Sequence, residues 1–283
     1  MEKYTLITGA CGGLGRAFVK ECASEGKNLI LTGTSEKKLN ALIEEFAEEL
    51  KGVKVQTLVL NLAKKDDRKN VIEFVKSQNI QIERLINNAG VIIEGDLERF
   101  SDDEISNAVE VNCVGTLDLT KKFLEVRNIE EKFEIITVAS LASSFPIPHM
   151  AVYAATKSFL ISMMTALAEE YKNKNVFITT VCPGGIRTTK EMIASLDSMG
   201  VGGKLSAVSA EKIAKQAIKG VKHKKRVVIP GVFNRILAGL SKPFSKKTLS
   251  KITGSIWKKS QEKRNFWYVF IIFFEMGLTK SVM

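Results

Sequence analysis

Cysteine and histidine are scarce in this chain. Its 283 residues include four cysteines, Cys11, Cys22, Cys113 and Cys182, and two histidines, with no C-x-x-C pair. A disulfide framework needs paired cysteines and a structural zinc site needs clustered ligands, so neither organises this fold. The pattern favours a reducing compartment and gives no support to metal catalysis.

Long apolar runs and a targeting segment are also missing. The longest apolar run, 266–274, has nine residues, whereas a membrane-spanning helix needs about 20. A strand-like run at 4–8 begins too early for a charged and then an apolar leader region to precede it. We therefore expect a cytoplasmic protein that does not cross a membrane.

Positive charge is unevenly distributed along the chain. Hydrophobic residues make up 45% and charged residues 26% of the sequence, as in ordinary globular proteins. The net charge is +11, yet residues 222–265 hold 13 Lys and Arg and a single acid. We predict a domain over 1–230, nearly neutral up to residue 221, and a basic extension over 231–283, whose charge suits an anionic surface.

Seven β-branched runs alternate with helical patterns. The runs lack polar alternation, which is typical of strands covered on both faces. The alternation predicts an α/β protein with a doubly wound, mostly parallel seven-stranded sheet and helices on both faces. The predicted strands are 4–8, 28–33, 53–60, 82–87, 133–139, 175–181 and 226–229. The predicted helices are 14–25, 36–50, 66–78, 102–127, 152–172 and 209–221, with a capping-box signal at Ser101 and Glu104.

A glycine cluster joins the first predicted strand to the first helix. The segment 8–15 reads T-G-A-C-G-G-L-G. Glycines permit a tight turn and close approach of the backbone to a pyrophosphate, and the helix that follows offers free N–H groups. Taken alone, the cluster also fits a simple turn.

Four polar residues further along form a second pattern. Tyr153 and Lys157 lie four apart on a predicted helix and share a face. Ser140 ends a strand, and Asn112 falls on the inward stripe of helix 102–127, where its amide needs partners. Taken singly, the Tyr153/Lys157 pair fits an ordinary helix surface, Ser140 fits a cap, and Asn112 fits a core amide whose hydrogen bonds are satisfied. All four residues in this order, after the glycine cluster, are hard to attribute to chance.

These residues resemble the short-chain dehydrogenase/reductase family. The matching motifs are T-G-A-C-G-G-L-G at 8–15, N-N-A-G at 87–90, Asn112, Ser140, Y-A-A-T-K at 153–157 and P-G at 183–184. The resemblance covers about 1–230. It implies a Rossmann-type sheet with a nicotinamide cofactor over the carboxyl ends of its strands.

The resemblance also implies roles for the four polar residues. Tyr153 would be the acid in ketone reduction and the base in alcohol oxidation, with its pKa lowered by Lys157 and by a cationic nicotinamide. Ser140 would donate a hydrogen bond to the carbonyl oxygen. Asn112 would hold a water, and Lys157 would also bind the ribose hydroxyls.

The cofactor would be NADP rather than NAD. Gly33 stands where an NAD-preferring relative carries Asp, and Thr34, Ser35 and Lys38 lie beside it. The family's arginine positions for NADP are vacant, and Asn61 replaces the usual Asp near the adenine. The implied cofactor contacts are Gly9, Cys11, Gly12, Gly13, Leu14, Gly15, Thr34, Ser35, Lys38, Asn61, Leu62, Asn88, Ala89, Gly90, Tyr153, Lys157, Pro183, Gly184, Ile186 and Thr188.

The substrate side is mostly apolar. The segment 141–150 and the lid residues Met192, Ile193, Leu196, Met199 and Val201 predict a lipophilic ketone or alcohol, although such residues also simply pack a lid.

The basic extension has apolar residues at helical spacing, Ile236, Leu237, Leu240 and Phe244 and then Leu249, Ile252 and Ile256. It would bind an anionic membrane surface, or pack on the body or on a second subunit of a homo-oligomer. Nucleic acid is not expected, since a basic patch is its only feature.

Two classes of function follow. The first is an NADP-dependent carbonyl reductase or alcohol dehydrogenase. The second is a nucleotide-binding scaffold protein of the same fold on a membrane surface, for which the complete set Asn112, Ser140, Tyr153 and Lys157 would be unnecessary.

Overall fold

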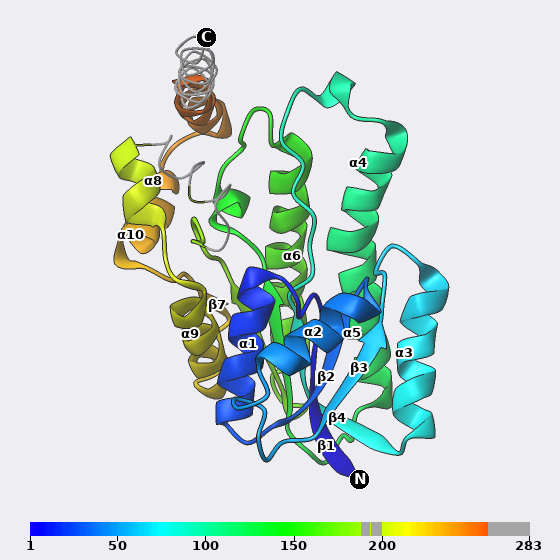
Figure 1. Ribbon diagram of the computed structural model, residues 1–283. Coiled ribbons are helices and arrows are strands. Elements are labelled where there is room, and N and C mark those ends of the chain that lie inside the picture. The colour runs from blue at the N-terminus through cyan, green and yellow to red at the C-terminus, as the bar shows by residue number, and fades with distance from the viewer. Residues whose placement is uncertain (188–192, 194–199, 260–283) are drawn as a thin grey trace, which may run out of the picture.

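Seven parallel strands form one sheet between two layers of helices (Figure 1). The computed structural model describes residues 1–187, 193 and 200–259. The strand order is β3-β2-β1-β4-β5-β6-β7, and each neighbouring pair is parallel. The strands are β1 (Glu2–Ile7), β2 (Asn28–Gly33), β3 (Val55–Val59), β4 (Ile80–Asn87), β5 (Phe133–Val138), β6 (Val176–Val181) and β7 (Val227–Val228). The predicted fold class is confirmed.

The helices divide into two groups, one on each face of the sheet. One face is covered by α1 (Gly13–Ser24), α2 (Glu36–Glu45) and α9 (Ala210–Lys222). The other is covered by α3 (Lys65–Ser77), α5 (Thr116–Val126) and α6 (Ala151–Glu170). Consecutive strand residues such as Leu6 and Ile7 are both fully buried, in different clusters. Since side chains alternate between faces, a strand covered on both sides must be apolar throughout.

The predicted helix over 102–127 consists of three pieces. The capping box at Ser101 and Glu104 is confirmed and starts α4 (Asp102–Val109). A π-helical turn, η2 (Glu110–Gly115), then precedes α5. Such turns are rare inside helices and occur frequently at functional sites. Here the turn carries Asn112, so the interruption falls at a predicted site residue.

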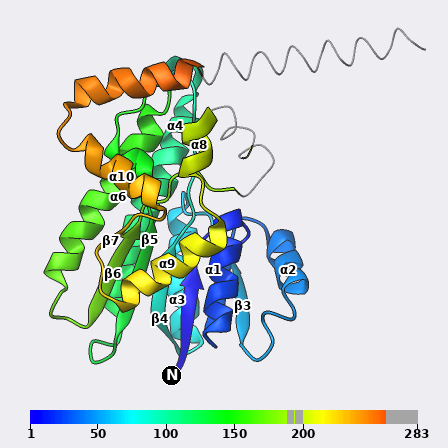
Figure 2. The ribbon, with the colours of Figure 1, turned by 90° about the vertical axis from the view of Figure 1, so that its left-hand side faces the viewer.

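Residues 231–259 of the C-terminal extension lie at the end of the molecule where the strands have their carboxyl ends (Figures 1 and 2). Two short helices, α8 (Gly200–Ser206) and α10 (Val232–Ser241), lie there, and helix 246–259 crosses the top of the molecule in Figure 2. Short turns η1 (Leu97–Arg99) and η3 (Leu141–Ser144) lie at the same end. The apolar run 266–274 lies outside the described residues.

One helix among the described residues is long and apolar enough to span a bilayer, namely α6. It is also the helix that carries Tyr153 and Lys157 and packs on β6. Its apolarity is therefore accounted for in part by its contact with the core.

Candidate active site

The glycine loop is built by close backbone packing. Gly9 adopts a left-handed φ of 64°, and a Cβ there would lie 2.9 Å from the Cα of Ala89. A Cβ on Gly15 would overlap with the carbonyl oxygen of Gly9. Both positions therefore require glycine. The loop is folded tightly over the end of β1, beside the start of α1.

The amino end of α1 is open to an anion. Gly12 is its N-cap residue, no side chain caps the helix, and no acid lies in its first turn, which includes Gly13 and Leu14. The first N–H groups of a helix lack intrahelical partners and carry partial positive charge. These free N–H groups suit a pyrophosphate, and glycine at 9 and 15 lets the loop backbone pack closely beside them.

The loop after β4 is joined to the glycine loop by hydrogen bonds. The Thr8 hydroxyl accepts from the backbone N–H groups of Asn88 (2.9 Å) and Ala89 (3.0 Å). The Asn88 amide donates to the carbonyls of Thr8 (2.9 Å) and Gly9 (3.1 Å). The two motifs, 79 residues or more apart in sequence, therefore form one surface.

Asn112 links this surface to α6. Its Oδ1 accepts from the N–H of Val91 (2.8 Å), and its Nδ2 donates to the Val91 carbonyl (2.9 Å) and to the Thr156 hydroxyl (3.1 Å). The side chain is fully buried. The partners that an inward amide requires are thus present, in the backbone of the 87–91 loop and on α6.

Lys157 is buried beside Asn112. Its Nζ donates to the Val138 carbonyl at 3.0 Å, and a Cβ on Gly90 would lie 3.2 Å from Nζ and 3.1 Å from Asn112 Oδ1. Burial lowers the pKa of Lys157 from 10.5 to about 8, against smaller opposing effects of Cys113 and Cys182. An ammonium removed from water is destabilised relative to the neutral amine.

Tyr153 lies one turn earlier on α6, with its ring centroid 5.8 Å from Lys157 Nζ. Burial raises the pKa of its phenol, and a hydrogen bond with Ser140 lowers it by less. The pKa lowering expected from Lys157 is therefore not found in the protein alone. A raised pKa keeps the phenol protonated at neutral pH, as a proton donor requires.

Ser140 follows β5 and caps the short turn η3. Its Oγ accepts from the N–H of Ala142 at 3.1 Å. The N–H of Leu141 donates to the Pro183 carbonyl at 2.8 Å, which fixes this turn against the predicted cofactor loop 183–184. The fold thus brings the four predicted residues together from β5, η2 and α6.

The end of β2 is open and has cations beside it. A Cβ on Gly33 would make ordinary contacts, at 3.7 Å from Cys11 Sγ. The Ser35 hydroxyl accepts from the N–H of Lys38 and caps α2. Burial raises the pKa of Cys11, while the charges of Arg16 and Lys38 act to lower it, so both cations are near this thiol. Arg16 was not identified as a candidate from the sequence, where its position in the first turn of α1 was the only available signal.

The turn after β3 is held by charged side chains. Asn61 Oδ1 accepts from the Ala63 N–H at 3.0 Å, and the Asn61 N–H donates to Asp67 at 2.8 Å. Arg68 donates to the Leu62 carbonyl and pairs with Asp118 at 2.9 Å. The Asn61 carbonyl oxygen is thus already engaged in its own turn.

The loop after β6 is supported by α10. A Cβ on Gly184 would lie 2.7 Å from the Asn234 amide, and Asn234 is fully buried, donating to the carbonyls of Ser206 (3.0 Å) and Pro230 (2.8 Å). Ile186 forms a parallel bridge with Val208. Thr188 and the lid residues Met192, Leu196 and Met199 lie outside the described residues. Asn234 was missed because it lies beyond the predicted domain.

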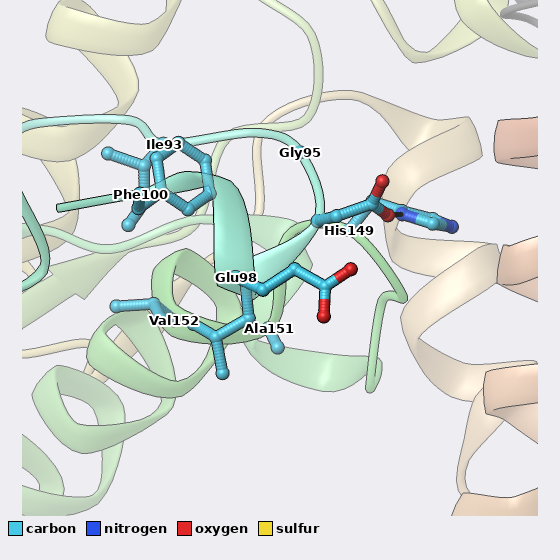
Figure 3. A pocket seen from close by; sticks show the side chains of 9 residues that line it. Ile93, Gly95, Glu98, Phe100, His149, Ala151 and Val152 are labelled. Carbon is cyan, nitrogen blue, oxygen red and sulfur yellow. Dashed lines mark hydrogen bonds and ion pairs between the residues drawn. The ribbon is translucent and has the colours of Figure 1, made fainter.

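Two cavities lie near the amino end of α6, and neither is lined by Asn112, Ser140, Tyr153 or Lys157. One, of about 310 Å³, is lined by residues of 93–100 and by His149, Ala151 and Val152 (Figure 3). The other, of about 520 Å³, lies between segment 143–148, α6 and helix 246–259. Within the described residues, no group of His, Cys, Asp and Glu is arranged to hold a metal.

Sequence comparison agrees with this geometry. The profile of the short chain dehydrogenases matches residues 3–198. The chain belongs to this family. It is therefore an oxidoreductase of the short-chain dehydrogenase/reductase type, with the Rossmann-like sheet of that family.

Two reductases from other organisms are similar to this chain in sequence. The chain is 33% identical over 201 residues, 67% of its length, to a very-long-chain 3-oxoacyl-CoA reductase of Neurospora crassa, and the match spans 60% of that relative. It is 33% identical over 186 residues to a 3-oxoacyl-[acyl-carrier-protein] reductase of Thermotoga maritima, covering 66% and 75% of the two chains.

Solved structures share the fold. A 7β-hydroxysteroid dehydrogenase structure matches with a TM-score of 0.78 and 22% identity, covering 89% of this chain and 96% of that one. A Burkholderia cenocepacia short chain dehydrogenase in complex with NADP matches with a TM-score of 0.71 and 21% identity, covering 82% and 98%. A Burkholderia phymatum relative matches in complex with NAD, with a TM-score of 0.72 and 20% identity, covering 85% and 92%.

Burial of Lys157 predicts a pH-dependent stability. The folded state holds this proton less tightly than the unfolded chain, so the free energy of unfolding increases as the pH rises from 8 to 10.5. Below pH 8 the buried ammonium lowers the free energy of unfolding by its full amount. We expect the stability of Lys157→Met relative to the parent to fall by roughly 3 kcal/mol over that range. Urea unfolding at pH 7, 8.5 and 10 measures this.

The control for this experiment is Lys215→Met, which alters an exposed lysine on α9. A stability difference between parent and Lys157→Met that stays constant from pH 7 to 10 would show that the ammonium is not desolvated in the folded protein.

Proposed function

We propose that the protein interconverts a lipophilic ketone and a secondary alcohol by hydride transfer with NADP. The observation that carries this proposal is the half-buried Tyr153 phenol, which is hydrogen-bonded to Ser140 and has Lys157 Nζ 5.8 Å from its ring centroid. The glycine loop lies at the carboxyl edge of the sheet, over the point between β1 and β4 where the chain's order in the sheet reverses. A nicotinamide bound there would supply or accept the hydride.

Each side chain then has a defined task. Tyr153 delivers a proton to the carbonyl oxygen in reduction and removes it in oxidation. Ser140 donates a hydrogen bond to the same oxygen as negative charge develops. Lys157 offers positive charge near the phenol, and Asn112 fixes α6 against the 87–91 loop. Cofactor contacts are assigned to the glycine loop, 88–90 and 183–186.

A nucleotide-binding scaffold is the second candidate. The fold and the glycine loop suffice to bind a nucleotide, and neither requires a catalytic step. Burying the Lys157 ammonium without catalysis would lower stability for no evident gain, which favours an enzyme. Binding of NADPH without turnover of any carbonyl compound would support the scaffold.

The apolar substrate class is supported by the segment between Ser140 and Tyr153. Phe145, Pro146, Ile147 and Pro148 form the segment between Ser140 and Tyr153, and they line one of the cavities. Relatives are named for reduction of 3-oxoacyl thioesters and, in Staphylococcus epidermidis, of diacetyl. A long-chain 3-oxoacyl thioester is therefore the first substrate to test.

Replacing the tyrosine hydroxyl tests the catalytic assignment. We expect Tyr153→Phe to lose more than about 90% of kcat, a loss above ~1.4 kcal/mol in transition-state stabilisation, because the ring remains but the proton donor is absent. The measurements are NADPH oxidation with a long-chain 3-oxoacyl thioester and NADPH affinity, which should be nearly unchanged. Tyr171→Phe, at the other end of α6, is the control. Retention of more than a tenth of kcat would refute the role of Tyr153.

Preference for NADP is supported by the end of β2. Gly33 places no acid where a 2′-phosphate would lie, and Arg16 and Lys38 are close to the adjacent Cys11. Cations there attract a phosphate of charge near −2, while an acid would repel it. Arg16 also pairs with Glu45 and lies over the Phe46 ring, at the carboxyl end of α2, so part of its charge is already compensated there.

An acid at position 33 should reverse the preference. The parent should have the higher kcat/KM with NADPH, and Gly33→Asp should favour NADH, because the carboxylate repels the 2′-phosphate and accepts from a ribose hydroxyl. The site has room for the new side chain. Gly33→Ala adds the Cβ without the charge and serves as the control. A parent that uses NADH equally well or better would contradict the assignment.

Contact with an anionic membrane is supported by the outer face of the extension. Its apolar side chains are about half exposed or more: Val232 64%, Ile236 52%, Leu240 61%, Phe244 51%, Ile252 47% and Ile256 48%. Exposed lysines surround them at 242, 246, 247, 251, 258 and 259. Apolar groups flanked by cations suit an anionic bilayer, to which each lysine contributes about 1 kcal/mol. Leu249 is instead buried, so it does not share the face of Ile252 and Ile256.

Co-sedimentation with vesicles tests this surface. We expect the full chain to pellet with anionic vesicles more than with neutral ones, and Ile236→Ser/Leu240→Ser to bind at least tenfold more weakly through lost apolar insertion. Ile129→Ser alters an apolar residue of similar exposure elsewhere and is the control. A full chain that stays in the supernatant with anionic vesicles would exclude the membrane. Truncation near 230 is unsuitable, since it removes the buried Asn234 and Ala238.

A homo-oligomer is supported by a second apolar surface. Val109, Val114 and Leu117 along α4, η2 and α5, and Phe159 on α6, are each more than a third exposed. Residues of this kind suit contact with a second copy of the chain.

A further inference from the structure

We propose that the C-terminal helix 246–259 is part of the active-site framework and that Trp257 is a positioning residue for Tyr153. This inference rests on the proposed function above for its catalytic part. Its structural part concerns the segment 145–150 alone and can be tested without any substrate.

Helix 246–259 has one face turned toward the body of the protein. Leu249 is buried, and Thr253, Gly254 and Trp257 are half-buried, at the three- and four-residue spacing of a single helical face. The Thr253 hydroxyl donates to the Pro146 carbonyl at 2.8 Å. A Cβ on Gly254 would lie 3.1 Å from Pro148, so the helix backbone closely approaches this segment.

Trp257 joins two loops at once. Its indole ring stacks on His149 with centroids 3.7 Å apart and planes inclined by 15°. Its Nε1 donates to Glu94 Oε1 at 3.0 Å. Stacked rings of this geometry contribute beyond their buried area. One side chain from the extension therefore contacts both the loop after β4 and the segment before α6.

His149 in turn connects these loops to each other. Its Nδ1 pairs with Asp96 at 2.7 Å, and its carbonyl accepts from the Gly95 N–H at 2.7 Å. Figure 3 shows the His149 ring directed away from Ile93 and Phe100, toward the C-terminal helix. His149 has a φ of 65°, a left-handed conformation that non-glycine residues rarely adopt. Such a conformation persists only where surrounding contacts impose it.

The position of His149 connects this cluster to the chemistry. Met150, the next residue, is the N-cap of α6, and Tyr153 lies in the first turn of that helix. The segment from Ser140 to Tyr153 is thus fixed at one end by β5 and at the other by the contacts of His149. A displacement of about 1 Å in a catalytic group can lower the rate about 100-fold. The stacking of Trp257 on His149 therefore helps to fix the position of Tyr153 relative to Ser140.

Hydrogen exchange on the full chain tests the structural part. In Trp257→Ala we expect amides of 145–152 to exchange at least tenfold faster, because local opening loses the stack, while those of α1 are unchanged. Trp257→Phe keeps an aromatic ring and should restore most of the protection. Ser255→Ala changes an exposed residue of the same helix and should match the parent.

Kinetics test the positioning role. In Trp257→Ala we expect kcat/KM for a long-chain 3-oxoacyl thioester to fall at least tenfold, with NADPH affinity within about twofold of the parent. Unchanged exchange at 145–152, or equal acceleration in α1, would overturn the proposal. Faster exchange with unchanged kcat/KM would overturn the positioning of Tyr153. If the parent turns over no carbonyl compound, the proposed function fails, and exchange alone still decides whether Trp257 holds the segment.

Discussion

Close backbone approach at the carboxyl edge of the sheet is the constraint on which the site depends. Gly9 lies against Ala89, Gly15 against Gly9, and Gly90 against Asn112 and Lys157. A Cβ at Gly9 or Gly15 would collide with backbone atoms, and one at Gly90 would crowd the side chains of Asn112 and Lys157. Because β1 and β4 are neighbours where the strand order reverses, the glycine loop and the four polar residues meet there.

Burial gives this edge its chemical character. Lys157 is removed from water and donates to a single backbone carbonyl, so its proton is held weakly. Tyr153 is half-buried, and this partial desolvation raises the pKa of its phenol, so its proton is held tightly. Desolvation thus acts in opposite directions on the two groups, because the charged form is the protonated one for lysine and the deprotonated one for tyrosine. The protein alone is set for proton donation by the phenol.

The extension has two faces with different surroundings. Its inner face contacts the loops at both sides of the site, through Asn234 on Gly184 and Trp257 on His149. Its outer face combines half-exposed apolar side chains with lysines. The described part of the segment that charge alone set apart therefore also contacts the loops of the body.

Local patterns in the sequence determined the strands, most helices, the capping box at Ser101 and the glycine loop, because each reflects periodicity or backbone freedom within a few residues. The family motifs also brought Asn112, Ser140, Tyr153 and Lys157 into one hypothesis. Only the tertiary structure decided the π-helical turn at Asn112, the raised pKa of Tyr153, the cations near Cys11 and the contacts of Asn234 and Trp257. These depend on burial and on contacts between residues such as Trp257 and Glu94, 163 positions apart. No local spacing encodes such a contact, because it exists only once the sheet has brought the loops together.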